Sequence, residues 1–304
     1  MKFWATAVSL LLASSFLFAA TPAAPDADYV QSFEKFKAHR IDSLKKNWIP
    51  LAGLFWLKPG VNTFGSAPDN IVVFPKGEAH AGEFDLAADG QVTLKLLPGV
   101  HVTVDGKPAE TATLVPDSAD HYTDVAMQEL RFHVIVRGKR VGIRLKDTAS
   151  EAARNFHEIT FFPPDLNYRV IARWIPADGK RMINVPDILG DVTHQKVTGT
   201  LVFQLNGKEL HLTDLGDDPS KGLFIVFNDP TLKTDTYPGG RMLDLDPPVK
   251  GTVVLDFNRA YNPPCVYTPY ATCPIAPKEN RLTVPILAGE KFERAAHAGT
   301  VHSR

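Results

Sequence analysis

The sequence lacks the short motifs that identify most familiar enzyme classes. It has no Gly-x-Ser-x-Gly turn and few serines after the N-terminal segment, which argues against a serine hydrolase. His157-Glu158 is not followed by a second histidine at the spacing of a zinc protease, and the sequence has neither a phosphate-binding loop nor the glycine pattern of a dinucleotide-binding site. The ten histidines are scattered along the chain. We therefore expect no metal site and no cofactor.

The chain also lacks an excess of charge of either sign. Its 33 Lys and Arg residues nearly balance its 34 Asp and Glu residues, and the formal net charge is −1 at pH 7. Binding to nucleic acid or to an anionic membrane surface requires a basic excess. We therefore expect no nucleic-acid partner.

The first residues have the pattern of a secretory signal peptide. A single charge at Lys2 precedes an apolar run over residues 5–20, and small residues with Pro22 and Pro25 follow it. We assign residues 1–24 to this signal and expect export to the periplasm or the cell exterior, with no transmembrane segment after cleavage. An uncleaved anchor is the alternative, although the apolar run is short for a membrane span.

Residues 25–47 predict one amphipathic helix. Apolar side chains such as Phe33, Phe36 and Leu44 recur at spacings of three to five with charged residues between them, and Pro50 stops the pattern. We expect this helix to pack on the main domain. A coiled-coil partner helix is the alternative.

From residue 48 onward, hairpin signals predict an all-β protein with antiparallel sheets. Asx-Gly pairs between β-rich runs favour type I′ turns, because these residues tolerate two positive φ angles. The predicted turns are at Asp89-Gly90, Asp105-Gly106, residues 137–140, Asp178-Gly179 and Asn206-Gly207.

The strand pattern breaks near residue 150. We therefore predict two antiparallel β-sandwich or barrel-like halves, residues 48–150 and 151–291, with residues 292–304 as a flexible tail. The first half has the strand rhythm of a forkhead-associated domain. It lacks that domain's Gly-Arg and Ser-x-x-His residues, so the similarity concerns shape alone.

The most informative segment is residues 256–280, between predicted strands at 252–257 and 282–287. Structureless connections of about twenty residues inside compact domains are usually functional or disordered, and the tyrosines and cysteines here argue against disorder. A disulfide between Cys265 and Cys273 is the first interpretation in an exported protein. A metal site would need further ligands, and the segment contains no histidine. Two free thiols are the third interpretation.

Polar side chains in and before this segment form the candidate site. We nominate Asp256, Glu279 and Tyr261 as catalytic residues, because a metal-free hydrolase needs a carboxylate within reach of a water molecule. The candidate ligand-binding residues are Arg144, Arg241, Asn258, Asn262, Tyr237 and Asn280.

These residues also have structural interpretations. Asparagines in such segments satisfy backbone amides in tight turns. Arg241 has a possible ion-pair partner in Asp229 or Asp256. Arg144 and Lys146 project on the same side of a strand, which is typical of a solvated strand face as well as of an anion site.

A combined motif is formed by Thr236-Tyr237-x-Gly239-Gly240-Arg241, Asp256-Phe257-Asn258-x-Ala260-Tyr261-Asn262-Pro263-x-Cys265 and Cys273-Pro274-x-x-Pro277-x-Glu279-Asn280. With this motif, residues 48–290 resemble the bacterial and archaeal family called domain of unknown function 1684. The resemblance implies no particular reaction, because the family has no established activity. One departure is Glu158, which stands where the family pattern has a glycine.

We therefore expect the partner to be an unknown anionic small molecule in a pocket covered by residues 256–280. Arg144 and Arg241 would hold its negative charge. The pocket is either purely a binding site or the active site of a metal-independent hydrolase. The alternative is a non-catalytic interaction or structural protein of the cell envelope with a disulfide-stapled segment.

Overall fold

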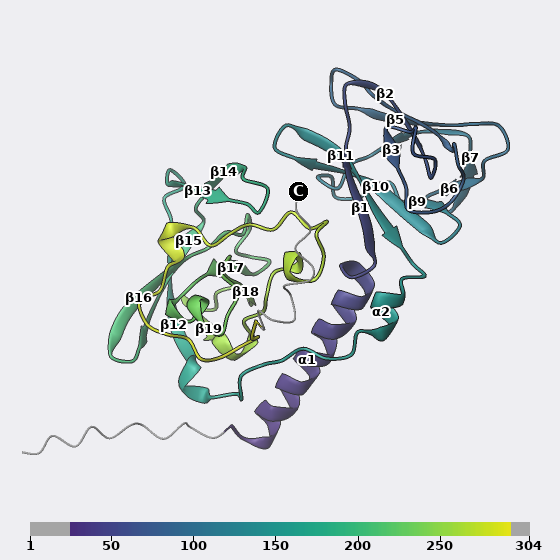
Figure 1. Cartoon of the computed structure of the whole chain (residues 1–304). Coiled ribbons are helices and arrows are strands. Elements are labelled where there is room, and N and C mark those ends of the chain that lie inside the picture. Colours follow the sequence, from purple (N-terminus) through teal and green to yellow (C-terminus); the bar gives the residue numbers. More distant parts are fainter. Residues whose placement is uncertain (1–24, 293–304) are drawn as a thin grey trace, which may run out of the picture.

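The computed structural model describes residues 25–292. The predicted signal peptide and nearly all of the predicted tail lie outside these residues. Within the described range, no helix is long and apolar enough to cross a membrane. The chain forms two β-rich halves with one long helix alongside them, which confirms the all-β prediction (Figure 1).

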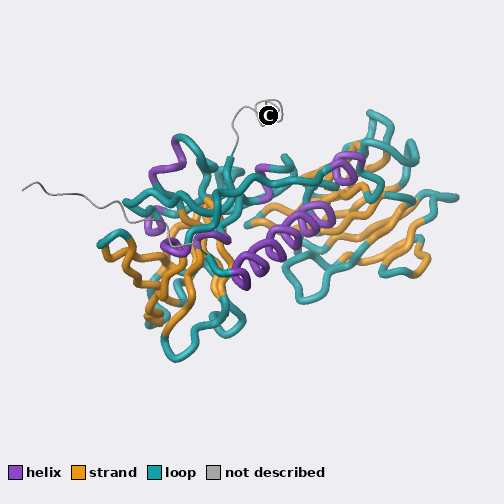
Figure 2. Tube along the Cα trace, turned by 90° about the horizontal axis from the view of Figure 1, so that it is seen from below, coloured by secondary structure: helices purple, strands orange, loops and turns teal. Residues whose placement is uncertain are grey.

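The predicted N-terminal helix is α1 (Ala27–Asn47). Asp26 caps it, because its carboxylate accepts a hydrogen bond of 2.7 Å from the Tyr29 backbone N–H. The helix packs against the second half of the chain, where the Phe33 ring meets the Phe161 ring edge-on at 5.6 Å. It then leads directly into the first half, so it runs along both halves (Figure 2).

Two sheets form the first half. The six-stranded sheet has the order β1 (Leu51–Trp56), β11 (Arg140–Asp147), β10 (Leu130–Arg137), β9 (Val125–Met127), β6 (Val102–Val104), β7 (Lys107–Ala109). The five-stranded sheet has the order β3 (Val72–Val73), β2 (Gly60–Gly65), β4 (Gly82–Leu86), β5 (Val92–Leu96), β8 (Thr111–Leu114). Phe64 and Phe84 of the second sheet contact Phe132 of the first, so the sheets enclose one core.

The two faces of β10 and β11 have different chemistry. Phe132 and Ile143 face the core, and side chains alternate along a strand, so their neighbours His133 and Arg144 face the other way. His133 and Arg144 are register partners on adjacent strands. This outer face of the sheet carries the basic side chains that become important below.

The second half combines one larger sheet with two hairpins. The four-stranded sheet has the order β16 (Lys208–Thr213), β15 (Gly199–Leu205), β12 (Arg169–Pro176), β19 (Thr252–Asp256). The hairpins are β13 (Met182–Pro186) with β14 (Val192–Lys196), and β17 (Leu223–Phe227) with β18 (Arg241–Leu245). A short helix, α2 (Glu151–Asn155), begins this half, and 3₁₀ turns occur at Leu166–Tyr168, Pro230–Lys233, Phe257–Arg259, Pro264–Val266 and Lys278–Asn280.

Four of the five predicted turns join paired strands. At Asn206-Gly207, for example, both residues have positive φ, 53° and 72°, as a type I′ turn requires. The turn at Asp178-Gly179 does not join its flanking strands, which corrects the prediction. The reason is that β15 and β19 occupy both edges of β12, so β13 pairs with β14 instead. A second difference from the predicted antiparallel sheets is that β2 and β3 pair in parallel.

The predicted strand at 282–287 does not form. Leu282, Val284 and Ile286 are buried in alternation, but these residues belong to no strand. The Leu282 N–H donates to the Asn228 carbonyl at 2.8 Å. Side chains serve Ile286: Asp229 accepts from its N–H at 3.0 Å, and Arg241 donates to its carbonyl at 3.0 Å.

Candidate functional site

A cleft of about 390 Å³ lies where α1, the first half and the 256–280 segment meet. We call it the arginine cleft. It is lined by Phe36, His39, Arg40 and Ser43 of α1, by Trp48 and Arg137, by Phe224, Met242 and Asp244, and by Tyr261, Pro264, Thr272, Cys273 and Pro274. Five of these residues come from the 256–280 segment, so that segment forms one wall.

Arg144 lies against this cleft as a buried cation. Its side chain is next to two lining residues: the guanidinium is 5.8 Å from the Trp48 ring, and Nη2 is 3.4 Å from Thr272 Oγ1. Only 7% of the residue is exposed, so it is not on a solvated strand face. Within residues 25–292 it forms no ion pair with a carboxylate, and its enclosed Nε has no hydrogen-bond partner. Burial, with a smaller contribution from the Arg137 charge, lowers the pKa of Arg144 to about 10.

Arg137 lies beside Arg144 but is neutralised. Asp117 accepts from both of its terminal nitrogens, at 2.7 and 3.0 Å, in a bidentate pair. Burial acts to raise the pKa of Asp117, but the hydrogen bonds and charge of Arg137 outweigh it and hold that pKa below its usual value. The Arg137 Nε donates to Thr272 Oγ1 at 2.9 Å, which connects the first half to the cleft wall.

Arg40 connects α1 to the same wall. It donates to the Asn262 carbonyl at 2.6 Å, lies 3.7 Å from Glu290 Oε2 and stacks over the Tyr261 ring at 4.6 Å. Asn262, a predicted ligand-binding residue, donates to Glu290 from its side chain at 2.9 Å and from its backbone at 3.0 Å. Burial raises the pKa of Glu290, and the nearby Arg40 opposes this shift. Asn262 thus holds the 256–280 segment in place through its hydrogen bonds to Glu290.

Tyr261 and Asp244 form the acidic end of the cleft. The Tyr261 hydroxyl donates to Asp244 Oδ2 at 2.6 Å. Burial, together with the negative charge of Asp244, raises the pKa of Tyr261, so the phenol stays protonated. Among the lining residues that the structure describes, Asp244 is the one carboxylate. Of the predicted catalytic residues, Tyr261 is the one that reaches this cleft.

The two cysteines lie close together but are not at disulfide distance, so the predicted disulfide is absent here and both are thiols. The Cys265 backbone N–H donates to Cys273 Sγ at 3.3 Å, and Tyr237 Oη lies 3.7 Å from Cys265 Sγ. A hydrogen bond from the Cys273 thiol lowers the pKa of Cys265 against the effect of burial, and Tyr237 adds to this. Tyr237 is thus next to the thiols, while Cys273 lines the cleft.

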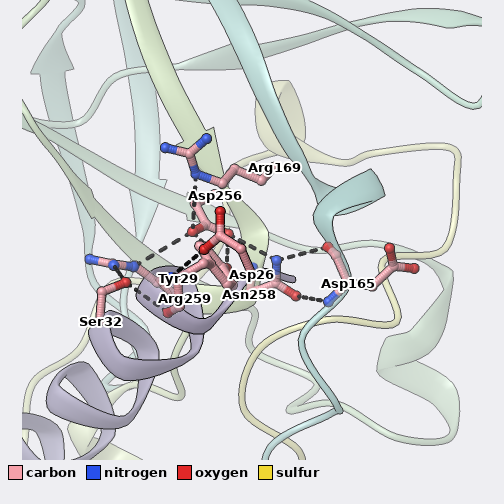
Figure 3. Close-up of polar contacts among 8 residues, drawn as sticks. All are labelled: Asp26, Tyr29, Ser32, Asp165, Arg169, Asp256, Asn258 and Arg259. Atoms are coloured by element: carbon pink, nitrogen blue, oxygen red, sulfur yellow. Dashed lines mark hydrogen bonds and ion pairs between the residues drawn. The ribbon is translucent and has the colours of Figure 1, made fainter. Parts of the chain in front are cut away.

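Asp256 belongs to a separate polar network (Figure 3). It accepts from the Tyr29 hydroxyl at 2.9 Å and from Asn258 Nδ2 at 3.0 Å, and the Nε atoms of Arg259 and Arg169 lie 3.6 and 3.9 Å away. Asn258 also exchanges two 2.9 Å hydrogen bonds with the Asp165 backbone. This network ties the start of α1 to β19 and to the segment before β12. Asp256 borders a smaller cleft of about 290 Å³.

Three other candidates lie away from both clefts. Arg241 is 1% exposed and pairs with Asp229 at 2.8 Å, one of the two partners that the sequence offered. Asn280 binds the Thr213 and Val226 backbones, and Glu279 has a buried Oε2 with no hydrogen-bond partner. The structure therefore does not bring Asp256 and Glu279 into one cleft, and their catalytic roles stay predictions. Residues 25–292 contain no group of three or more His, Cys, Asp or Glu residues suited to a metal ion.

The comparisons with known proteins agree with the C-terminal motif. Residues 154–291 match the family described as Protein of unknown function (DUF1684). The chain belongs to this family. An uncharacterized protein of Haloarcula marismortui, solved by NMR, is 31% identical over 47% of this chain and 80% of its own, with a TM-score of 0.38. None of the curated proteins matches the chain.

The family match divides the arginine cleft. Tyr261, Thr272 and Cys273 lie inside the matched residues, whereas the lining residues Trp48 and Arg137 lie outside them. The resemblance expected over 48–290 is therefore confirmed for the second half. Sequence reasoning identified Arg144 and Tyr261, but it overlooked Arg40, Arg137 and Asp244, because nothing in their local sequence indicates that they meet.

Proposed function

We propose that this protein binds an anionic small molecule in the arginine cleft, with the 256–280 segment as one wall. The observation that carries the proposal is Arg144, a buried guanidinium with no carboxylate partner in residues 25–292. Burying an uncompensated charge is costly, whereas a bidentate anion would satisfy both its charge and its free donors.

A metal-independent hydrolase is the catalytic form of this proposal. Asp244 supplies a carboxylate that could accept a proton from water, and the Tyr261 hydroxyl holds it at 2.6 Å. The anion would be held by Arg144 while Asp244, which lines the same cleft, accepts the proton. If this form is correct, Asp244→Asn abolishes turnover and retains binding of the anion.

The proposed location is the periplasm or the cell exterior, from the signal pattern in residues 1–24. The alternative function, a cell-envelope interaction protein, is supported by the outer face of the four-stranded sheet. There Ile171 of β12, 62% exposed, is the register partner of the exposed Val254 of β19. The disulfide staple is not retained in this alternative, because Cys265 and Cys273 are free thiols. We expect two titratable thiols on denatured, unreduced protein.

The test uses calorimetric titration with 3-phenylpropionate, phenyl phosphate and the uncharged 3-phenylpropanamide. We expect at least one anion to bind and the amide to bind at least tenfold more weakly. Arg144→Met should weaken anion binding at least tenfold, because hydrogen bonds to charged groups contribute about 1.5–3 kcal/mol.

The matched control is Arg173→Met, which removes an exposed arginine from β12 and should leave binding unchanged. The proposal fails if neither anion binds, or if Arg144→Met and Arg173→Met bind equally well.

A further inference from the structure

We infer that the ligand of the arginine cleft is an organic monocarboxylate with an apolar body, bound at its carboxylate by Arg144 and the Thr272 hydroxyl. This inference rests on the proposed function and specifies its ligand class. Phosphate esters, dicarboxylates and bare inorganic anions are the classes it excludes.

The charges around the cleft favour a ligand with a single negative charge. Arg137 is neutralised by Asp117, and Arg40 is paired with Glu290. Of these three guanidiniums, Arg144 is therefore the one with no carboxylate at ion-pair distance in the described residues, and the more distant charge of Asp117 compensates it only in part. Asp244 in the same lining would repel a second negative charge on the ligand. A monoanion satisfies Arg144, whereas a dianion brings excess negative charge into a cleft that already contains a carboxylate.

The hydroxyl of Thr272 adds a second donor next to Arg144. Its oxygen accepts from Arg137 Nε at 2.9 Å and makes a longer contact of 3.4 Å with Arg144 Nη2. A hydroxyl oxygen has two lone pairs, so both are engaged by arginines and its proton remains to be donated. Within the described part of the chain this hydroxyl donates to no other group, and Thr272 lines the cleft. Arg144 and Thr272 thus offer two neighbouring donors, which suits the two oxygens of one carboxylate.

The remaining walls indicate that the ligand has an apolar body. Most of the larger lining side chains are apolar or aromatic: Phe36, Trp48, Phe224, Met242, Pro264 and Pro274. A volume of about 390 Å³ is in the range of small-molecule sites, which combine apolar walls with a few polar groups that orient the ligand. A small hydrophilic anion would leave these walls without contacts.

The test compares three probes by calorimetric titration of the full chain at pH 7.5: 3-phenylpropionate, phenyl phosphate and acetate. We expect 3-phenylpropionate to bind at least tenfold more tightly than either of the others. Thr272→Val should weaken its binding about tenfold, because it removes the donor and retains the shape. Thr272→Ser keeps the hydroxyl and should restore affinity to within about threefold of the wild type, well inside the tenfold step of 1.4 kcal/mol.

The outcomes separate the two proposals. Tighter binding of phenyl phosphate overturns the monocarboxylate class and leaves the anion-binding function intact. If acetate binds as tightly as 3-phenylpropionate, the inference that the ligand has an apolar body is wrong. Failure of both aromatic anions overturns the anion-binding function itself. If Thr272→Val destabilises the fold, Thr272→Ala removes the same donor and is compared with Thr272→Ser. Affinities of these two variants for 3-phenylpropionate within about threefold of each other overturn the role of the hydroxyl.

Discussion

Arg241 and Arg144 are both buried, yet their surroundings differ in a way that separates structure from function. Arg241 lies in the second half with Asp229 at 2.8 Å and with the carbonyls of Ile286 and Ala288 as further acceptors. Arg144 lies on the outer face of the first half beside a cleft, with one long contact to Thr272. A buried guanidinium that is paired with a carboxylate and with backbone carbonyls of its own chain has little left to offer a ligand. A guanidinium without a carboxylate partner can still bind an anion.

The same comparison explains the glycines before Arg241. A Cβ on Gly240 would lie 2.7 Å from the Phe227 carbonyl oxygen and 2.8 Å from the Ala276 Cβ, and its φ is +103°. The backbone at Gly240 therefore approaches the protein's own β17 and the 256–280 segment closely. Gly240 directly precedes Arg241, which pairs with Asp229.

The largest expected effect is on the Arg241 side. Arg241→Met leaves Asp229 as a buried, unpaired carboxylate, and breaking a buried pair in this way costs about 3–5 kcal/mol. Urea denaturation should show this loss as a lower midpoint with an unchanged slope. A loss below about 1 kcal/mol would mean that Arg241 is not the structural member of the comparison.

The next effect concerns His133, the register partner of Arg144. Burial and then the Arg144 charge lower its pKa to about 4, with Lys146 acting in the same direction and Asp117 and Asp124 against it. His133 binds a proton near pH 6.5 in the unfolded chain but only near pH 4 in the folded chain. The free energy of unfolding is therefore highest above pH 6.5 and decreases as the pH falls toward 4. We expect a loss of about 2–3 kcal/mol across that window relative to His133→Gln.

An NMR titration of the imidazole checks the cause. Arg144→Met should raise the pKa of His133 toward its ordinary value, and so should a bound carboxylate that neutralises Arg144. An unchanged pKa in the variant would show that the Arg144 charge does not reach His133.

A smaller effect is expected at Asp256, whose network resembles that of Arg241 in having many internal partners. Asp256→Asn keeps the shape but removes the charge that faces Arg169 and Arg259, both partly exposed. We expect a loss of about 1 kcal/mol in thermal or urea unfolding, because exposed ion pairs contribute little. Loss of turnover with unchanged stability and unchanged ligand binding would instead support the catalytic role predicted for Asp256.

The smallest stability effect should come from Arg144 itself. Arg144→Met removes a buried charge that lacks a partner in the described residues, so unfolding free energy should change by less than about 1 kcal/mol or rise. The same variant should lose anion binding. A loss of several kcal/mol on urea unfolding would place Arg144 with Arg241 as a structural residue and remove the basis of the proposed function.

The amino-acid sequence by itself determined the local features of this protein. Four of the five predicted turns, the amphipathic helix and the family motif each depend on a few neighbouring residues, so they could be predicted directly. Arg144 and Tyr261 were nominated for the same reason. The strands that pair with β12 and the hydrogen-bond partners of residues 282–287 could not be predicted, because other strands and side chains compete for the same backbone groups.

Only the tertiary structure decided which charges are compensated. Arg144, Arg137, Asp117 and Thr272 come from separate segments, and their contacts determine which arginine is free. Electrostatic energy depends on distance and burial in three dimensions, neither of which is encoded in the order of residues. The sequence therefore indicated that arginines matter here, and the packing of the two halves against α1 decided that Arg144, rather than Arg241, lies beside the arginine cleft with no ion-pair partner in the described residues.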